Sequence, residues 1–307
     1  MNIDKILIAC HRKDFWQTKI CVASIRYWYP DFPISLIKDV SNGDFDTKEL
    51  QEKFDIGVES LEFNKFGWGV SKFEPLFNKE RKRLLILDSD IVFLGRVLDY
   101  LNIFDQDFVI DEELIEDANT PYFKKTYFDL DKVNKTIDPV YKFPGFAFNT
   151  GQFLCTTGIF KREDFLDYIE WRYGQVPVLK KTDTFACADQ GIFNFFLQQK
   201  TQQGKISLGR AKFMIWGNSK EISGIDENKI FSKEGYDKLI HWAGGFKSFD
   251  KINRIDILLF YQKIYYSRVS FGEVKRLYFN FSHNAIFKIK KLRKNYGIVT
   301  FLKRIFH

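Results

Sequence analysis

Two aspartates spaced one residue apart follow a short apolar run and are well placed to hold a metal ion. The run 84–87 (Leu-Leu-Ile-Leu) leads directly into Asp88, Ser89 and Asp90. Four large aliphatic residues bounded by polar ones are typical of a buried strand. Ligands of open α/β sheets gather beyond the carboxyl ends of such strands. The carboxylates are therefore predicted to hold a hard divalent cation and, through it, an anionic substrate.

The spacing alone does not identify the site, because Asp-x-Asp occurs four times. The pairs are Asp44/Asp46, Asp88/Asp90, Asp105/Asp107 and Asp129/Asp131. The first follows turn-forming residues, and the last two lie among acids and lysines, so all three favour solvated loops. Only the pair at 88 and 90 ends a buried-type strand. This context favours a metal site there over a simple turn.

A histidine and a lysine near the C-terminal third could complete such a site. His241 and Lys247 lie six residues apart around Gly244 and Gly245. The imidazole could complete the metal shell and the ammonium could neutralise phosphate, while glycine allows close approach of the backbone. The alternative for His241 is a core histidine beside Trp242.

Three further groups of polar residues suit a sugar-bearing diphosphate. Asn149-Thr150-Gly151 would offer hydrogen bonds to sugar hydroxyls, and Asp189-Gln190 opens a predicted helix with a carboxylate beside an amide. Lys72 precedes the metal-site strand and could reach the same anion. Each has a structural alternative, since an aspartate can cap a helix and a lysine can be a surface charge.

Length and composition allow a substantial core. The 307 residues, 45% of them apolar, suffice for one large or two small domains. The four cysteines form no Cys-x-x-Cys pair, so neither a zinc site nor a disulfide framework is indicated and a reducing compartment is expected. The N-terminal apolar stretch is too short for a signal peptide, and no stretch reaches transmembrane length.

The elements that must position these residues follow an alternating pattern. Strands are predicted at 6–9, 33–37 and 84–87, with helices at 15–27 and 47–53 between them, which is the order of βαβ units. Further predictions are strands at 91–94, 152–156 and 239–243, helices at 163–173 and 189–199, and an insertion or mobile cover over the site at 111–144. Together they predict one α/β catalytic domain, residues 1–262, followed by a tail, residues 263–307.

The tail carries the positive charge of the chain. Residues 263–307 contain eleven lysines and arginines and one acid, Glu273, whereas the remainder has 36 bases and 39 acids. Ile298, Phe301, Leu302, Ile305 and Phe306 fall on one helical face, and Tyr265, Tyr266, Tyr278, Phe279 and Phe281 supply aromatics. This pattern predicts a basic amphipathic helical tail on an anionic membrane surface. The alternative is a terminal helix docked on its own domain. No nucleic-acid-binding motif accompanies the charge, so nucleic acid is not predicted as a partner.

In this order the motifs resemble the nucleotide-sugar glycosyltransferases of the GT-A fold, and most closely glycosyltransferase family 8, the group of lipooligosaccharide galactosyltransferases and glycogenin. The resemblance spans residues 6–247. In that family an apolar strand ends in Asp-x-Asp, and Asn-x-Gly, Asp-Gln and His-x-x-Gly-x-x-Lys follow. The matching residues are Asp88/Asp90, Asn149/Gly151, Asp189/Gln190 and His241/Gly244/Lys247. The fold implied is a Rossmann-like, mostly parallel central sheet flanked by helices.

The resemblance also implies roles for these residues. Asp88, Asp90 and His241 would bind Mn²⁺ or Mg²⁺, with Lys247 and Lys72 at the donor diphosphate. Asp189 would orient the donor sugar and Gln190 would stabilise the sugar cation. The residues implied in donor binding are Ala9, Cys10, His11, Lys72, Asp88, Ser89, Asp90, Asn149, Thr150, Gly151, Gly244 and Lys247. The loop at Ala9–His11 takes the uridine-binding position but lacks the family's usual small and acidic residues, so the base remains open.

The function predicted is a metal-dependent transfer of a hexose or related sugar, with retention, from a nucleotide-diphosphate donor such as a UDP-sugar to a cell-surface glycan or lipid-linked acceptor. The enzyme is expected in the cytoplasm, peripheral at the inner face of the membrane. Low Met and abundant Lys, Ile, Asn and Phe are associated with AT-rich genomes, which is compatible with a bacterial enzyme of polysaccharide biosynthesis. Three alternatives remain open: an inverting transferase with Asp189 or Asp183 as base, a sugar nucleotidyltransferase, and a non-catalytic membrane-surface scaffold.

Overall fold

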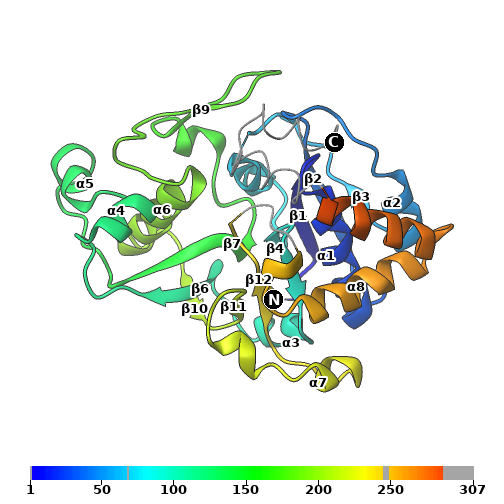
Figure 1. Ribbon diagram of the computed structural model, residues 1–307. Coiled ribbons are helices and arrows are strands. Elements are labelled where there is room, and N and C mark those ends of the chain that lie inside the picture. Colours follow the sequence, from blue (N-terminus) through cyan, green and yellow to red (C-terminus); the bar gives the residue numbers. More distant parts are fainter. Residues whose placement is uncertain (1, 68, 245–248, 286–307) are drawn as a thin grey trace, which may run out of the picture.

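A seven-stranded sheet in the order β10-β6-β7-β4-β1-β2-β3 forms the centre of the protein (Figure 1). The computed structural model describes residues 2–67, 69–244 and 249–285. The strands are β1 (Lys5–His11), β2 (Ile34–Asp39), β3 (Gly57–Val58), β4 (Arg83–Asp88), β6 (Phe108–Leu114), β7 (Phe146–Thr156) and β10 (Leu208–Ala211). Neighbours pair in parallel except around β7, which is antiparallel to β4 and β6. The predicted α/β fold with a mostly parallel sheet is confirmed.

A second, three-stranded sheet lies beside the end of β4. It consists of β11 (Met214–Trp216), β12 (Leu239–His241) and β5 (Ile91–Phe93), with β12 between the other two. The chain leaves the main sheet at Asp88 and enters the small sheet at Ile91. The Asp-x-Asp turn therefore joins the two sheets. A short hairpin, β8 (Ile169–Glu170) with β9 (Val178–Leu179), completes the strands of the described residues.

Helices lie on both sides of the main sheet (Figure 1). The α-helices are α1 (Phe15–Trp28), α2 (Lys48–Phe54), α3 (Val97–Leu101), α4 (Pro121–Thr126), α5 (Leu130–Thr136), α6 (Asp189–Gln202), α7 (Glu227–Phe231) and α8 (Ile255–Ser267). Residues 272–285 are also helical. A short 3₁₀ helix, η1 (Val70–Phe77), leads to β4. Helices α1 and α8 pack together on one side, while α6 packs on β7 on the other.

Two hydrophobic cores result, one on each side of the sheet. The first contains aliphatic residues of β1, α1, β5, β12 and α8. The second is mostly aromatic and lies under η1, α4 and α6, where the ring of Phe193 meets those of Phe73 and Phe153 at centroid distances of 5.3 and 4.9 Å. The high phenylalanine content of the chain is thus used as core.

Two of the local predictions are wrong because tertiary packing decides these segments. The predicted helix at 163–173 is a 3₁₀ turn, η2 (Arg162–Phe165), followed by β8. Arg162 there lies against aromatic rings and pairs with Glu74 at 2.8 Å. The segment 111–144 is not an inserted cover, because it contains the end of β6 and helices α4 and α5, and its Phe123, Tyr127 and Phe128 belong to the second core.

The predicted tail is only partly described. Helix α8 crosses the proposed boundary at 262/263, and the ring of Tyr265 is buried in a stack on Phe54. The prediction of an interfacial Tyr265 is therefore wrong. Residues 286–307, with the predicted apolar face at 298–306, lie outside the described residues. Among the residues that are described, no helix is both long and apolar enough to cross a membrane.

Candidate active site

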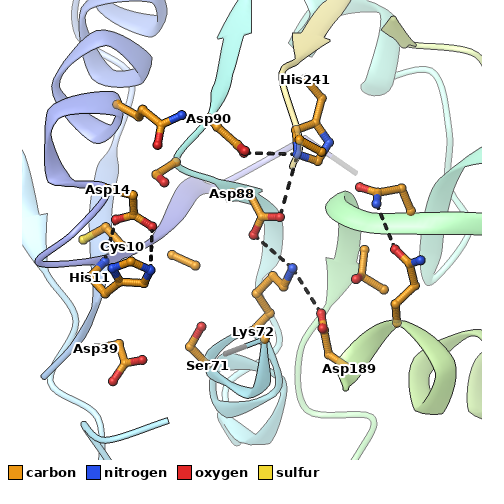
Figure 2. A pocket seen from close by; sticks show the side chains of 18 of the residues that line it. Cys10, His11, Asp14, Asp39, Ser71, Lys72, Asp88, Asp90, Asp189 and His241 are labelled. Atoms are coloured by element: carbon orange, nitrogen blue, oxygen red, sulfur yellow. Dashed lines mark hydrogen bonds and ion pairs between the residues drawn. The ribbon is translucent and has the colours of Figure 1, made fainter. Parts of the chain in front are cut away.

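A cavity of about 620 Å³ opens at the carboxyl ends of β1, β2 and β4, next to the first turn of α6 (Figure 2). Most residues proposed from the motifs line it. They are Ala9, Cys10, His11, Lys72, Asp88, Ser89, Asp90, Asn149, Thr150, Asp189, Gln190, His241 and Gly244. The sheet brings them together because parallel strands present their carboxyl ends at one edge.

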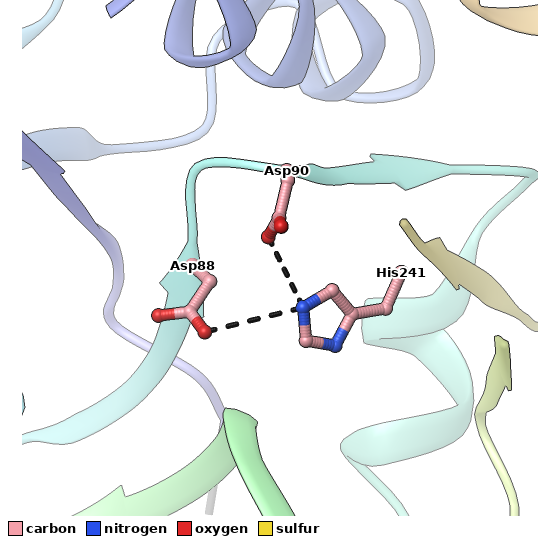
Figure 3. Close-up of side chains that lie close together, drawn as sticks. All are labelled: Asp88, Asp90 and His241. Atoms are coloured by element: carbon pink, nitrogen blue, oxygen red, sulfur yellow. Dashed lines mark ion pairs between the residues drawn. The ribbon is translucent and has the colours of Figure 1, made fainter. Parts of the chain in front are cut away.

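Asp88, Asp90 and His241 converge on one point (Figure 3). The Nε2 atom of His241 lies 3.1 Å from Asp90 Oδ1 and 4.0 Å from Asp88 Oδ2. One ligand atom from each residue lies within 4.8 Å of the other two, so the three could hold one metal ion. Two carboxylates with one imidazole suit Mn²⁺ or a similar divalent ion.

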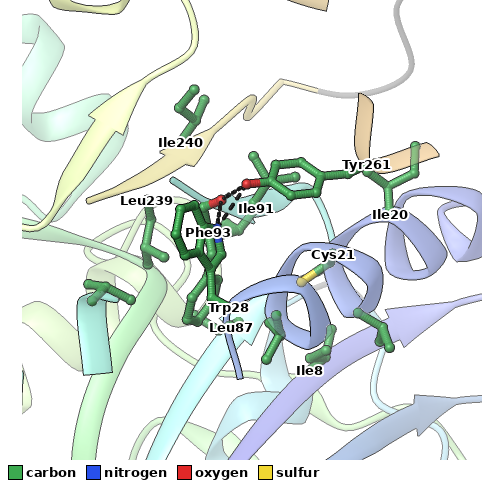
Figure 4. Packing of buried hydrophobic residues seen from close by; sticks show 14 of the residues in the cluster. Ile8, Ile20, Cys21, Trp28, Leu87, Ile91, Phe93, Leu239, Ile240 and Tyr261 are labelled. Carbon is green, nitrogen blue, oxygen red and sulfur yellow. Dashed lines mark hydrogen bonds between the residues drawn. The ribbon is translucent and has the colours of Figure 1, made fainter. Parts of the chain in front are cut away.

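The core beneath this triad holds its two strands in place (Figure 4). In β5, the carbonyl oxygen of Phe93 accepts hydrogen bonds from Trp28 Nε1 at 3.2 Å and from Tyr261 Oη at 2.6 Å. Strand β12 pairs with β5 so that His241 lies opposite Ile91, and the Trp242 amide donates to the Asp90 carbonyl at 3.1 Å. The backbone therefore fixes the distance between the Asp-x-Asp turn and the imidazole.

Gly151 explains why the Asn-x-Gly pattern ends in glycine. A Cβ atom at this position would lie 2.4 Å from His241 Cε1, 2.6 Å from Asn149 Oδ1 and 2.9 Å from Asp88 Oδ2. Strand β7 thus passes directly against two of the metal-site side chains. The Gly151 amide also donates to Asn149 Oδ1 at 2.8 Å. Gly151 shapes the site rather than contributing a side chain to the cavity.

Lys72 links the metal site to the first turn of α6. Its Nζ lies 2.9 Å from Asp88 Oδ1 and 3.1 Å from Asp189 Oδ2, and the side chain is 7% exposed (Figure 2). Burial alone would lower the pKa of Lys72, but the two carboxylates raise it above its ordinary value. The ammonium therefore remains charged and acts first on the protein's own carboxylates.

His241 and Asp90 also form a charged pair. Burial alone favours the neutral imidazole, but the nearby Asp90 carboxylate raises the pKa of His241 above its ordinary value. Burial opposes ionisation of Asp90 too, yet the imidazole lowers the pKa of that carboxyl. Without a metal, a proton on His241 supplies the positive charge at this point.

The cavity is acidic as a whole. Its lining contains Asp14, Asp39, Asp88, Asp90 and Asp189 against two lysines, Lys13 and Lys72. Five carboxylates facing one space would repel an anionic diphosphate. A divalent cation at the Asp88–Asp90–His241 triad would reverse this, and the acidic lining is a second observation that fits a metal site.

Asp189 and Gln190 begin α6 after a strained backbone. Cys187 and Ala188, with φ of 50° and 53°, are in the left-handed region, which costs free energy for residues with a Cβ and often marks a functional site. Burial raises the pKa of Asp189, with Lys72 opposing this effect. The Gln190 amide accepts from Asn149 Nδ2 at 2.8 Å and donates to the Thr126 carbonyl at 3.1 Å.

The opposite end of the cavity contains residues that were not singled out from the sequence. Asp14 accepts from the His11 amide at 2.9 Å, and its Oδ2 lies 3.1 Å from His11 Nε2. Burial raises the pKa of Asp14 to about 6. Asp39 ends β2 and accepts from the amides of Ser41 and Phe66. Its position directly after the apolar run at 33–37 was an available signal, because β2 ends at the same sheet edge.

Two proposed residues are not placed in the cavity. Lys247 lies outside the described residues. Asp183, the alternative base of an inverting mechanism, is an exposed residue paired with Lys132 at 2.9 Å and does not line the cavity. The other Asp-x-Asp pairs lie elsewhere, as expected: Asp129, for example, caps α5 by accepting from the amides of Asp131 and Lys132.

Comparison with solved structures places this fold among GT-A glycosyltransferases. The glycosyltransferase GlyE of Streptococcus pneumoniae TIGR4 is 14% identical, with a TM-score of 0.52 over 92% of this chain and 64% of that one. The apo structure of the bifunctional glycosyltransferase WbbM is 12% identical, with a TM-score of 0.55 over 88% of this chain and 52% of that one. The chain thus spans between half and two thirds of their lengths.

At these identities the likeness concerns the fold, and it confirms the GT-A architecture. The narrower resemblance to family 8 remains a prediction. No protein-family model matches the sequence. A search of curated proteins also finds no match.

Proposed function

We propose that the protein is a metal-dependent glycosyltransferase that moves a hexose or related sugar from a nucleotide-diphosphate donor, a UDP-sugar, to a glycan or lipid-linked acceptor of cell-surface polysaccharide synthesis. One observation carries the proposal. Within a GT-A fold, a triad of metal-type ligands, Asp88, Asp90 and His241, lies in the same cavity as the sugar-type polar groups of Asn149, Asp189 and Gln190.

In this proposal the triad binds Mn²⁺ or Mg²⁺, which when bound supplies positive charge to the diphosphate leaving group. Lys72 holds Asp88 and Asp189 in fixed positions relative to each other, so the ion site and the sugar end of the cavity keep one geometry. Lys247, by the family resemblance, adds charge at the diphosphate. His11 and Asp39, at the other end of the cavity, are placed to contact the nucleoside.

We propose retention of the anomeric configuration. An inverting reaction needs a carboxylate that is free to take the acceptor proton. Asp189, the remaining candidate, is 5% exposed and ion-paired with Lys72, which favours a role in orienting the donor over that of a base. Gln190 would then stabilise positive charge on the sugar through its amide oxygen. NMR of the product determines the anomer directly, and an inverted product would reject this assignment.

The experiment that tests the activity is a donor screen with Mn²⁺, read by release of the nucleoside diphosphate. The variant Asp88→Asn/Asp90→Asn should lose turnover and the Mn²⁺ requirement together. Asp44→Asn/Asp46→Asn is the matched control, because it makes the same change at an exposed loop. Equal turnover by the triad variant and the wild type would end the proposal.

The two alternatives from the sequence predict other outcomes. A sugar nucleotidyltransferase would release pyrophosphate from a nucleoside triphosphate. A scaffold would turn over no donor and still bind vesicles.

We also propose that the protein works at the cytoplasmic face of a membrane, held there by residues 263–307. The helix at 272–285 supports this by presenting apolar side chains to solvent. Phe271, Val274, Leu277, Tyr278 and Phe281 are between 57 and 83% exposed. The last four repeat at intervals of three and four residues, so they form one helical stripe.

Charge favours an anionic membrane over a second copy of the chain as the occupant of this stripe. Eleven basic residues and one acid lie in 263–307, and a symmetric dimer through the stripe would bring two such segments together. Anionic lipid headgroups instead attract each base by about 1 kcal/mol.

Vesicles of phosphatidylcholine with and without phosphatidylglycerol test this location. Leu277→Ser/Phe281→Ser should weaken binding about tenfold or more, since each buried apolar side chain contributes roughly 1.5–3 kcal/mol. Leu114→Ser/Val140→Ser is the control, because these residues are 73 and 80% exposed elsewhere. Unchanged vesicle binding by the stripe variant, or a dimer that dissociates with it, would contradict a membrane role.

A further inference from the structure

The orientation of the His241 ring has an unusual support. A histidine that binds a metal through one nitrogen commonly donates its other ring N–H to a fixed acceptor, which sets the direction of the ring. In His241, Nε2 faces the two aspartates, so Nδ1 is the other nitrogen. Nδ1 is buried and has no hydrogen-bond partner among the described residues. Another contact must hold the ring there.

Trp216 makes that contact. Strands β11 and β12 pair in parallel so that Trp216 lies directly opposite His241. The two rings stack with centroids 5.2 Å apart and an angle of 21° between their planes. Because neighbouring side chains on one face of a sheet are held by the backbone register, the indole covers the imidazole at a fixed distance. An aromatic face thus takes the place of the usual hydrogen bond.

Trp216 is itself held by a polar chain that begins in the second core. Its Nε1 donates to Glu113 Oε1 at 3.1 Å, and Glu113 Oε2 accepts from Tyr127 Oη at 2.5 Å. Tyr127 is 1% exposed, so the chain is anchored in a rigid part of the molecule. Glu113 accepts both hydrogen bonds, which requires its carboxylate or an isosteric amide.

The same anchor also reaches the sugar end of the cavity. Thr126, the residue before Tyr127, accepts from the Gln190 amide through its carbonyl, and the Tyr127 carbonyl accepts from the Ala186 amide at 2.8 Å. The end of α4 therefore touches both the loop before Asp189 and, through Glu113 and Trp216, the metal triad.

We infer that Glu113 and Trp216 are positioning residues for the metal site, which fix the His241 ring in the direction that lets Nε2 meet an ion held by Asp88 and Asp90. Neither residue lines the cavity, so neither is assigned a contact with the substrate. The inference rests on the metal ion of the proposed function. It does not depend on which sugar or acceptor the enzyme uses.

Mn²⁺ binding without any nucleotide, measured by electron paramagnetic resonance, tests the inference. Glu113→Ala should weaken Mn²⁺ binding about 10- to 100-fold, the range for groups that orient a metal ligand. Glu113→Gln should recover most of this loss, because the amide still accepts from the indole N–H. Trp216→Phe keeps a ring over His241 but loses the tether, and it should lie between wild type and Glu113→Ala.

Glu112→Ala is the matched control. Glu112 precedes Glu113 on β6 and pairs with Arg210 at 2.9 Å, so its loss should leave Mn²⁺ binding unchanged. Thermal unfolding with EDTA and with Mn²⁺ separates positioning from a merely structural role. The rise in melting temperature on adding Mn²⁺ should shrink in Glu113→Ala and persist in Glu112→Ala.

Three results would overturn the inference: Mn²⁺ affinity of Glu113→Ala within twofold of wild type, an equal loss in Glu112→Ala, or no binding of Mn²⁺ by the wild type. Failure of the transferase proposal looks different. In that case the wild type binds Mn²⁺, Glu113→Ala weakens it, and no sugar nucleotide is turned over.

Discussion

Replacing Gly151 by alanine should weaken the metal site without adding or removing a ligand. The new Cβ would lie 2.4 Å from His241 Cε1, and ordinary contacts of this kind begin at 3.4 Å, so the ring or β7 must move by about 1 Å. Metal–ligand distances tolerate changes of only about 0.2 Å. The ring can shift when the site holds no ion, but it must return to bind one. The strain of overpacking, about 1–3 kcal/mol, therefore opposes metal binding.

That free energy corresponds to Mn²⁺ affinity about 5- to 150-fold lower. Isothermal titration calorimetry of Gly151→Ala measures it, and Gly224→Ala is the control, because a Cβ at Gly224 meets nothing within 4 Å. Nucleotide binding in the presence of saturating Mn²⁺ should recover. Should Gly151→Ala bind Mn²⁺ as tightly as Gly224→Ala, the triad does not close on an ion beside β7.

Two further predictions concern the scaffold around the site. Burial raises the pKa of Asp111 to about 6, so the native state holds its proton more tightly than the unfolded chain, and stability falls as pH rises from about 4 to 6. Asp111→Asn should match wild type at pH 4 and unfold in urea with about 1–3 kcal/mol more stability at pH 7.5; a parallel pH profile for both would reject this. Glu74→Ala should lower the free energy of unfolding by about 3–5 kcal/mol, because it leaves Arg162 without its buried partner. Loss of Glu62, the exposed partner of the same arginine, should cost about 0–1 kcal/mol, and equal costs would contradict the argument.

Local patterns predicted the half of the protein in which strand and helix signals are strong. The βαβ order of the first hundred residues and the strand before Asp88 were apparent because each is an apolar run with clear ends. Asp88, Asp90 and His241 were selected together by motif order, and the paired strands β5 and β12 supply the physical reason. The ligands themselves carry no signal of their mutual distance.

The parts that could not be predicted depend on packing between distant segments. Residues 111–144 look polar and mixed, yet their aromatic side chains fill the second core, which no local pattern reveals. The pairing of Lys72 with both Asp88 and Asp189 depends on how η1 and α6 meet at the end of β4. Trp216 and Glu113 could not be singled out either, because a stack on a histidine requires the register of β11 on β12.

Asp88 is the residue through which these distant contacts affect chemistry. One of its oxygens accepts from Lys72 at 2.9 Å, and the other faces His241 at 4.0 Å. Lys72 in turn holds Asp189 at the sugar end of the cavity. An ion drawing on Asp88 Oδ2 reduces the negative charge available to Lys72, which strengthens the share that Asp189 must supply. Metal binding and donor-sugar orientation are thus linked through a single carboxylate, and neither can change without the other.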